Sequence, residues 1–149
     1  MKILISACLL GLPCRYDGAS KPQPWGKALA ERYELVPVCP EQLGGLPTPR
    51  APSERQGTRV VMNTGADVTA QYRRGAESAL ALCRLLGCET AILKERSPSC
   101  GHGRIYDGTF TGSLTDGDGV TAELLLSHGI RVLGESRAEE LLHCGEEKG

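Results

Sequence analysis

The sequence predicts an α/β fold, a single domain over residues 1–149 with a Rossmann-like, mostly parallel sheet and helices on both faces. Short β-branched runs alternate along the chain with segments of helical apolar period, and this order favours parallel strands joined by right-handed crossovers. A chain of 149 residues has the length of one domain and buries about two-thirds of its unfolded surface. No internal repeat or break in composition marks a second domain.

The first part of the chain is expected to form two strands and a short helix. Lys2–Ala7 is a β-branched run typical of a buried first strand, and a loop rich in Gly and Pro follows from Gly11 to Pro24. Gly26–Tyr33 has the pattern of a short helix. Glu34–Val38 is expected to be the second strand, and Pro37 favours a sheet edge or a strand end because proline cannot donate a ladder hydrogen bond.

The middle of the chain contains the clearest helix. Cys39–Pro52, with four prolines and two glycines, is expected to be loop, and Arg59–Met62 is expected to form a small ribbon. Asp67–Leu86 is predicted to be a helix that stops at Gly87, with Thr64 or Asp67 placed to cap its start. Its apolar stripe consists of Val68, Ala76, Ala79, Leu80, Cys83 and Leu86.

Two strands and two helices are expected in the remainder. They are Glu89–Leu93 and Ile130–Leu133 as strands, and Val120–Ser127 and Ala138–Cys144 as helices. Residues 117–122 match the loose pattern G-x-G-x-x-A, but they occur late in the chain and do not directly follow a predicted strand, which excludes a dinucleotide-binding fold. The start of the helix there remains a candidate anion site.

Charge and composition exclude several classes of function. The 17 Lys and Arg residues nearly balance 18 Asp and Glu, and aromatic residues make up 4%, so no nucleic-acid partner is expected. No apolar run is long enough to span a membrane, and only five residues separate Lys2 from Cys8, too few for the apolar part of a signal peptide. A cytoplasmic protein is therefore expected, and seven cysteines in a reducing compartment indicate metal binding or catalysis.

Three cysteines occupy equivalent places in the predicted fold. Cys8, Cys39 and Cys100 follow the first, second and third predicted strands, although 31 and 61 residues separate them along the chain. The carboxyl ends of parallel strands meet at one edge of a sheet, where ligands bind, so these thiols are expected to converge. Cys14 lies in a nearby loop and is an ambiguous fourth. The remaining cysteines are expected to be small buried hydrophobes: Cys83, Cys88 and Cys144.

Polar residues beside these cysteines are candidates for chemistry. Glu41 lies two residues after Cys39, and the turn Ser97-Pro98-Ser99-Cys100-Gly101 presents two hydroxyls next to a thiol. A surface carboxylate and an ordinary turn are the simpler interpretations. Sulfur ligands suit zinc, copper(I) or iron–sulfur clusters.

Three linked blocks of sequence carry a resemblance to a known family. They are Ser6–Gly11 with Arg15–Gly18, Pro37–Glu41 with Gly44–Pro47, and Leu93-Lys94 with Ser97–Gly101. Together they resemble the thiouracil desulfidase (TudS) family, formerly a domain of unknown function. The similarity continues through residues 65–69 and 119–122 and so covers nearly the whole chain.

The resemblance implies a cofactor and a reaction. The cofactor is a [4Fe–4S] cluster whose ligands here are Cys8, Cys39 and Cys100, with one iron left open. The reaction is the non-redox removal of sulfur from a thiolated pyrimidine, such as 4-thiouracil or a 4-thiouridine nucleotide, with release of hydrogen sulfide. Near-neutral charge and the lack of the extra domain found in relatives acting on tRNA favour a small-molecule substrate.

The resemblance also implies residue roles. Glu41 and Ser97 are the expected catalytic pair, and Arg15 and Ser99 are expected substrate contacts.

The residues themselves leave two alternative functions open. One is a structural or redox-sensing iron–sulfur or zinc-binding protein without turnover. The other is a zinc hydrolase with three cysteine ligands and Glu41 as base.

Overall fold

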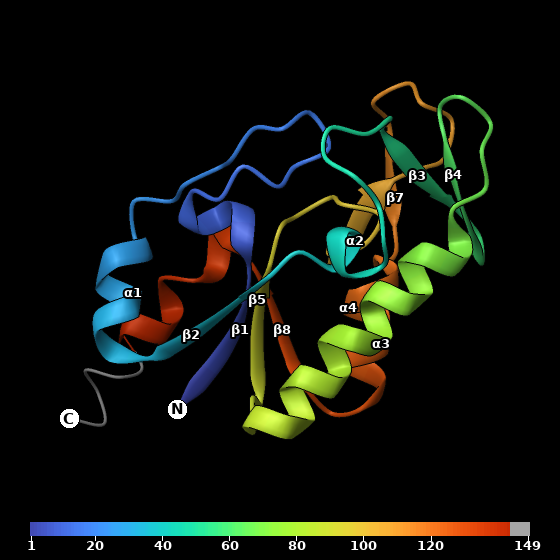
Figure 1. The fold of residues 1–149 in the computed structure, drawn as a ribbon. Helices are drawn as coiled ribbons and strands as arrows, with labels where there is room; N and C mark the ends of the chain where they lie inside the picture. The colour runs from blue at the N-terminus through green and yellow to red at the C-terminus, as the bar shows by residue number, and fades with distance from the viewer. Residues whose placement is uncertain (144–149) are drawn as a thin grey trace.

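A computed structural model describes residues 1–143, and its centre is a four-stranded sheet in the order β2-β1-β5-β8 (Figure 1). All three strand pairs are parallel, and Ile3 of the first strand aligns with Leu35 on one side and Thr90 on the other. The predicted α/β fold with a parallel sheet is confirmed. The strands are β1 (Lys2–Ser6), β2 (Glu34–Val38), β5 (Thr90–Leu93) and β8 (Arg131–Gly134).

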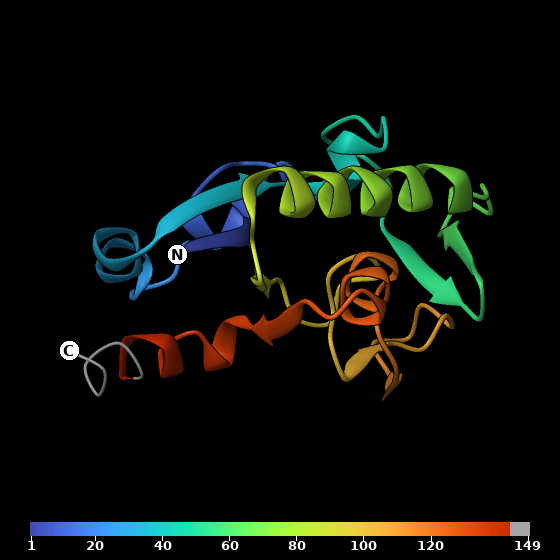
Figure 2. The same cartoon turned by 90° about the horizontal axis from the view of Figure 1, so that it is seen from below.

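Helices cover both faces of this sheet, as the sequence predicts. Leu4 points into a core with α3 (Thr69–Leu86) and α4 (Val120–Ser127). Its neighbours Ile3 and Ile5 point the other way, into a core with α1 (Gly26–Arg32), because successive strand side chains face opposite sides. Figure 2 shows α3 and α4 on one side of the sheet and α1 on the other.

Several boundaries differ from the sequence prediction; α3, for example, begins at Thr69 and not at Asp67. The first strand ends at Ser6, and a 3₁₀ turn, η1 (Ala7–Leu10), follows. Inside the expected loop Cys39–Pro52, a one-turn helix, α2 (Pro40–Leu43), begins at a proline, a residue whose fixed φ suits the first helical position. After β8 comes a second 3₁₀ turn, η2 (Glu135–Arg137), and residues 140–143 are helical. Cys144 of the last predicted helix lies outside the described residues.

Two antiparallel hairpins project beyond the sheet. The expected ribbon, β4 (Arg59–Met62), pairs with β3 (Ser53–Gln56), and a hairpin that the sequence analysis missed joins β6 (Arg104–Tyr106) to β7 (Leu114–Asp116). Glu54 of β3 links the two hairpins, because its buried carboxylate accepts the backbone N–H groups of Gly108 and Phe110. The hairpins therefore form one rigid unit above the sheet.

The start of α4 is not an anion site, contrary to the expectation. Its first backbone N–H groups are taken by carbonyl oxygens of the preceding turn: Val120 donates to Pro98, and Thr121 donates to Ser99. A Cβ on Gly119 would lie 2.4 Å from the Ser99 carbonyl carbon, so only glycine allows this contact. The glycine-rich pattern therefore serves to seat the turn that carries Cys100 on α4.

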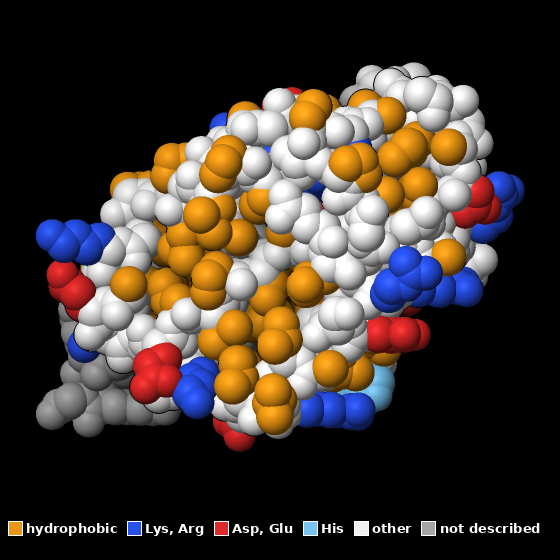
Figure 3. All heavy atoms as spheres, viewed as in Figure 1, with side chains coloured by type: hydrophobic (Ala, Val, Ile, Leu, Met, Phe, Trp, Pro, Cys, Tyr) orange, Lys and Arg blue, Asp and Glu red, His pale blue; other side chains and the backbone are white. Residues whose placement is uncertain are grey.

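Apolar side chains gather over β2 and α3 on the face shown in Figure 3. Among the large hydrophobic side chains of residues 1–143, Leu85 of α3 is the most exposed, at 79%, and Val36 of the edge strand is only partly buried. Within residues 1–143, no helix combines the length and the apolar character needed to cross a membrane.

Helix α2 rests directly on α3 through two glycines. A Cβ on Gly75 would lie 1.9 Å from the Pro40 carbonyl oxygen, and one on Gly44 would lie 1.9 Å from the Gln71 carbonyl oxygen. Both obstacles are backbone atoms, which cannot rotate away. The close approach fixes α2, and with it Glu41, against the long helix.

Gly75→Ala is expected to destabilise the protein by about 2 kcal/mol, because overpacking outweighs the gain of about 1 kcal/mol in helix propensity. The matched control is Gly26→Ala in α1, where a Cβ meets nothing closer than a Leu10 methyl group at 3.7 Å. This control is expected to be neutral or stabilising. Urea unfolding of both variants tests the contact, and equal stabilities would contradict it.

Candidate active site

A cavity of about 680 Å³ lies at the carboxyl edge of the sheet. Its walls come from the ends of β1, β2 and β5 and from the two hairpins, so segments far apart in the sequence meet there. Its volume falls in the usual range for small-molecule sites, about 300–1,000 Å³. Of the residues proposed from the sequence, six line this cavity: Cys8, Arg15, Cys39, Glu41, Ser97 and Cys100.

Four thiols line the cavity, three of them the expected ligands. Cys14 lies between two of these, since its thiol is in hydrogen-bonding contact with the thiols of both Cys39 and Cys8. Cys39 also donates through its Sγ to the backbone oxygen of Cys14, at 3.6 Å. The contact with Cys14 and burial raise the pKa of the Cys39 thiol well above its ordinary range. The ambiguous fourth cysteine is therefore part of the same sulfur-rich wall.

Cys100 is the most enclosed of the four thiols. Burial raises its pKa to about 12, while hydrogen-bonding contacts with the Ser6 and Ser99 hydroxyls oppose that shift. Ser6 is itself fixed, because its Oγ accepts the Lys94 backbone N–H at 2.9 Å. The thiol thus keeps its proton at neutral pH until a metal displaces it, with two hydroxyls already arranged to stabilise the thiolate.

Glu41 lies in the first turn of α2, and 19% of its side chain is exposed. Its Oε1 accepts a hydrogen bond from the Tyr72 hydroxyl at 2.5 Å and another from Arg50 Nε at 3.3 Å. The Arg50 side chain is only 2% exposed, so this ion pair is shielded from water. The carboxylate is held in one place beside the thiols.

The two serines of the Cys100 turn differ in their positions. Ser97 lines the cavity, and its Oγ accepts the backbone N–H groups of Ser99 and Cys100, both at 3.1 Å, which leaves its own hydrogen available to donate. Ser99 is fully buried, its hydroxyl pairs with Thr121 at 2.8 Å, and it does not line the cavity. The Ser99 hydroxyl therefore faces α4 and not the cavity.

Several cations surround the mouth of the cavity. Lys94 is paired with Glu135 at 3.0 Å. Arg15, Lys21 and Arg96 also line the cavity, and none of them forms an ion pair with another side chain of residues 1–143. Their charge is available to an anionic ligand.

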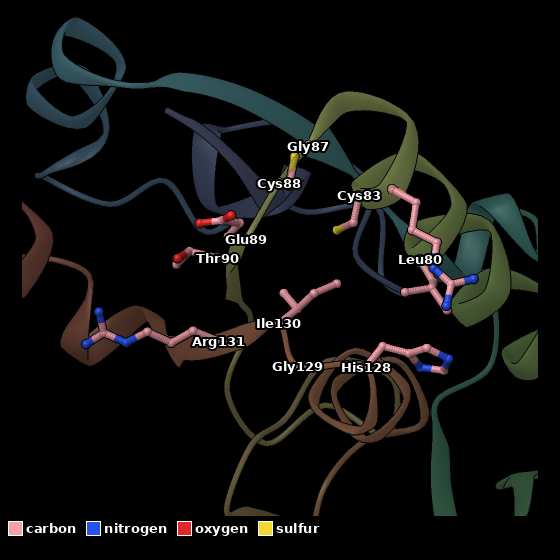
Figure 4. A pocket seen from close by; sticks show the side chains of 11 residues that line it. Leu80, Cys83, Gly87, Cys88, Glu89, Thr90, His128, Gly129, Ile130 and Arg131 are labelled. Carbon is pink, nitrogen blue, oxygen red and sulfur yellow. The ribbon is translucent and has the colours of Figure 1, made fainter.

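A second cavity, of about 590 Å³, lies at the opposite end of the sheet (Figure 4). Cys83 at the end of α3 and Cys88 before β5 line it, and their thiols are in hydrogen-bonding contact. Cys83 is 1% exposed and Cys88 is 5% exposed, which confirms that both are buried.

Across residues 1–143, no three His, Cys, Asp or Glu side chains form a group that would hold a single metal ion.

Burial and the contact with Cys88 raise the pKa of the Cys83 thiol from 9.0 to about 12. Because the folded value is the higher one, the contribution of this thiol to stability is complete below pH 9 and is lost as the pH rises toward 12. The stability lost in Cys83→Ala is therefore expected to shrink by about 1 kcal/mol between pH 8 and pH 10. Urea unfolding at both pH values measures this, with Leu80→Ala on the same helix as a control of constant effect. A constant effect of Cys83→Ala would contradict the shift.

Sequence analysis missed the partners that fix these groups. Tyr72 lies on the apolar stripe of the long helix, and a buried tyrosine requires a partner for its hydroxyl, so its position was a usable signal. Arg50 lies in a proline-rich loop, and nothing in its surroundings marked it. Ser6, at the end of β1, had no signal beyond its neighbour Cys8.

Comparison with known proteins agrees with this geometry. Residues 3–137 match the 2-thiouracil desulfurase family. A solved structure of a [4Fe-4S]-dependent thiouracil desulfidase, TudS, is 53% identical and superposes with a TM-score of 0.91, covering 96% of each chain. The uncharacterized protein YbbK of Bacillus subtilis (strain 168) is 41% identical over 150 residues, which cover 94% of this chain and 99% of YbbK. This chain therefore belongs to the 2-thiouracil desulfurase family.

Proposed function

We propose that this protein removes sulfur from a thiolated pyrimidine by net hydrolysis, converting 4-thiouracil or a 4-thiouridine nucleotide and water to the uracil form and hydrogen sulfide. The carbon–sulfur bond breaks, a carbon–oxygen bond forms, and no electrons are gained or lost overall. The observation that carries the proposal is the convergence of four thiols, Glu41 and Ser97 on one cavity of small-molecule size.

The thiols of the cavity fit an iron–sulfur cluster. Cys8, Cys39 and Cys100 would be its ligands, because each follows the end of a different strand and lines the cavity from its own side. Thiolates are the usual ligands of such clusters, and a cluster with three of them supplies a soft, open iron for a thiocarbonyl sulfur. The Ser6 and Ser99 hydroxyls would stabilise the Cys100 thiolate.

Glu41 and Ser97 would act on the water that attacks the ring carbon. Glu41 accepts a proton from this water as the carbon–oxygen bond forms and returns it to the departing sulfur. The second water proton leaves the new hydroxyl on the ring carbon as the carbonyl forms, so that the sulfur departs as hydrogen sulfide. Ser97, whose hydroxyl hydrogen is available, donates a hydrogen bond that orients the water or the pyrimidine. A positioned general base is worth about 10²–10⁴ in rate.

The cations at the mouth favour a nucleotide over a free base. Arg15, Lys21 and Arg96 line the cavity without a carboxylate partner in the described part of the chain, and guanidinium and ammonium groups bind phosphate well. The proposed substrate class is therefore a thiolated pyrimidine nucleoside monophosphate.

The proposal is tested by anaerobic purification and reconstitution, followed by assays of iron, zinc, sulfide and turnover. We expect hydrogen sulfide release from 4-thiouracil and from 4-thiouridine monophosphate, with the lower KM for the monophosphate. A cluster-loaded protein that releases no sulfide from any thiolated pyrimidine would favour a structural or sensing role. A protein that contains zinc without iron would favour the zinc alternatives.

A further inference from the structure

The donors on Glu41 are arranged unequally between its two oxygens. Tyr72 and Arg50 both donate to Oε1, at 2.5 Å and 3.3 Å. Neither residue donates to Oε2. Both donors therefore hold the Glu41 carboxylate through the same oxygen, which restricts the rotation of the carboxylate.

Tyr72 is built into the core at this point. It is 2% exposed, packs with Leu46, Val60 and Val68, and its hydroxyl is in hydrogen-bonding contact with Ser53. Burial and the negative charge of Glu41 raise the pKa of the phenol far above its ordinary range, so the hydroxyl remains a donor at every working pH. Because the ring cannot move, the position of its hydroxyl determines where Oε1 lies.

Arg50, which lies in the loop after α2, donates to the same oxygen. Its Nη1 donates to Thr48 Oγ1 at 2.9 Å and to the Pro47 carbonyl at 3.2 Å. Its Nη2 donates to the Cys14 carbonyl at 3.0 Å. Arg50 therefore links Glu41 to the loop that carries Cys14.

We propose that Tyr72 and Arg50 are positioning residues, which hold Glu41 through Oε1 so that Oε2 is the oxygen left for the attacking water. This inference rests on the proposed function, since it concerns how the proposed base is aimed. Neither residue is required to touch the substrate. Their effect should therefore appear in the rate of the chemical step and be absent when Glu41 is absent.

Tyr72→Phe tests the inference, because it removes one hydroxyl from a buried ring. With 4-thiouracil as substrate, we expect kcat to fall about 10- to 100-fold, the worth of a hydrogen bond to a charged group, with KM within about twofold. Iron and sulfide content and the change in cluster absorbance on substrate binding should be unchanged. In the Glu41→Gln background, Tyr72→Phe should cause no further loss of kcat. The control is Tyr33→Phe, which removes a hydroxyl that donates to the Leu141 carbonyl at 2.7 Å, and which should leave kcat unaltered.

The possible failures are distinguishable. If Glu41→Gln abolishes turnover while Tyr72→Phe keeps normal kcat, or if the two losses add in the double variant, the positioning role is overturned and the proposed function stands. If the Glu41→Gln variant has a normal kcat, the proposed role of Glu41 and the inference are both wrong.

If Tyr72→Phe proves unstable, Arg50→Lys is the substitute test, because lysine keeps the positive charge but lacks the planar guanidinium group that donates several hydrogen bonds at once. The same loss of kcat at constant KM is then expected, and a normal kcat would overturn the inference.

Discussion

Glu41→Gln is expected to lower the rate of hydrogen sulfide release by about two to four orders of magnitude, the usual worth of a positioned general base. Glutamine is nearly isosteric with glutamate and still accepts through its amide oxygen, so α2 and its contact with Tyr72 should survive. The substituted side chain cannot take a proton from water at neutral pH. Steady-state assays with 4-thiouracil, on protein of equal iron content, measure the loss.

The control for this variant is Glu95→Gln. The Glu95 carboxylate lines the same cavity, but it accepts a hydrogen bond from the Ser136 backbone N–H. We expect it to change the rate by less than about tenfold, because it is not asked to move a proton. Ser97→Ala should be milder than Glu41→Gln, since it removes an orienting hydrogen bond only. Near-normal release by Glu41→Gln would remove this carboxylate from the chemistry.

Replacing Cys8, Cys39 or Cys100 singly with alanine is expected to abolish both cluster binding and turnover, because an iron–sulfur cluster needs direct thiolate ligation. Iron content after anaerobic reconstitution should fall from about four per chain to below about one. Iron and sulfide assays, with the visible absorbance of the cluster, measure this result.

Cys14→Ala is the matched control, since Cys14 is a thiol of the same wall, in contact with Cys8 and Cys39. We expect this variant to keep its iron and most of its activity. If it loses iron as completely as Cys8→Ala, four cysteines ligate the cluster and no iron is open to substrate.

The central sheet was predictable because its strands carry their own signals. β-branched runs and the switch between faces at Ile3, Leu4 and Ile5 identify β1 as a buried strand, and the same logic identifies β5 and β8. The convergence of Cys8, Cys39 and Cys100 then followed from topology, since parallel strands end at one edge.

The hairpins were hard to predict because their stability depends on tertiary contacts. β6 and β7 have three residues each, too short for a periodic pattern, and Glu54 anchors them through backbone groups that no side-chain pattern records. The same holds for α2, whose four residues depend on the contact between two glycines and a neighbouring backbone.

The sequence was enough to place most of the proposed site residues at one edge of the sheet, but it gave little sign of the residues that hold them. Glu41 lies two residues after Cys39, whereas its donor Tyr72 lies 31 residues away, and a hydrogen bond between distant residues leaves no local sequence pattern. The burial of Ser99 could not be seen from its neighbours, because its hydroxyl pairs with Thr121, which lies 22 residues away.

The proposed mechanism requires that three cysteines hold a cluster with one open iron, to which the sulfur of the substrate binds. Mössbauer spectroscopy of protein reconstituted with ⁵⁷Fe tests it most directly, with and without 4-thiouracil. We expect one of the four irons to differ from the other three and to change its isomer shift when substrate is added, in the wild type and equally in Glu41→Gln. Four equivalent irons that do not respond to 4-thiouracil would contradict the claim.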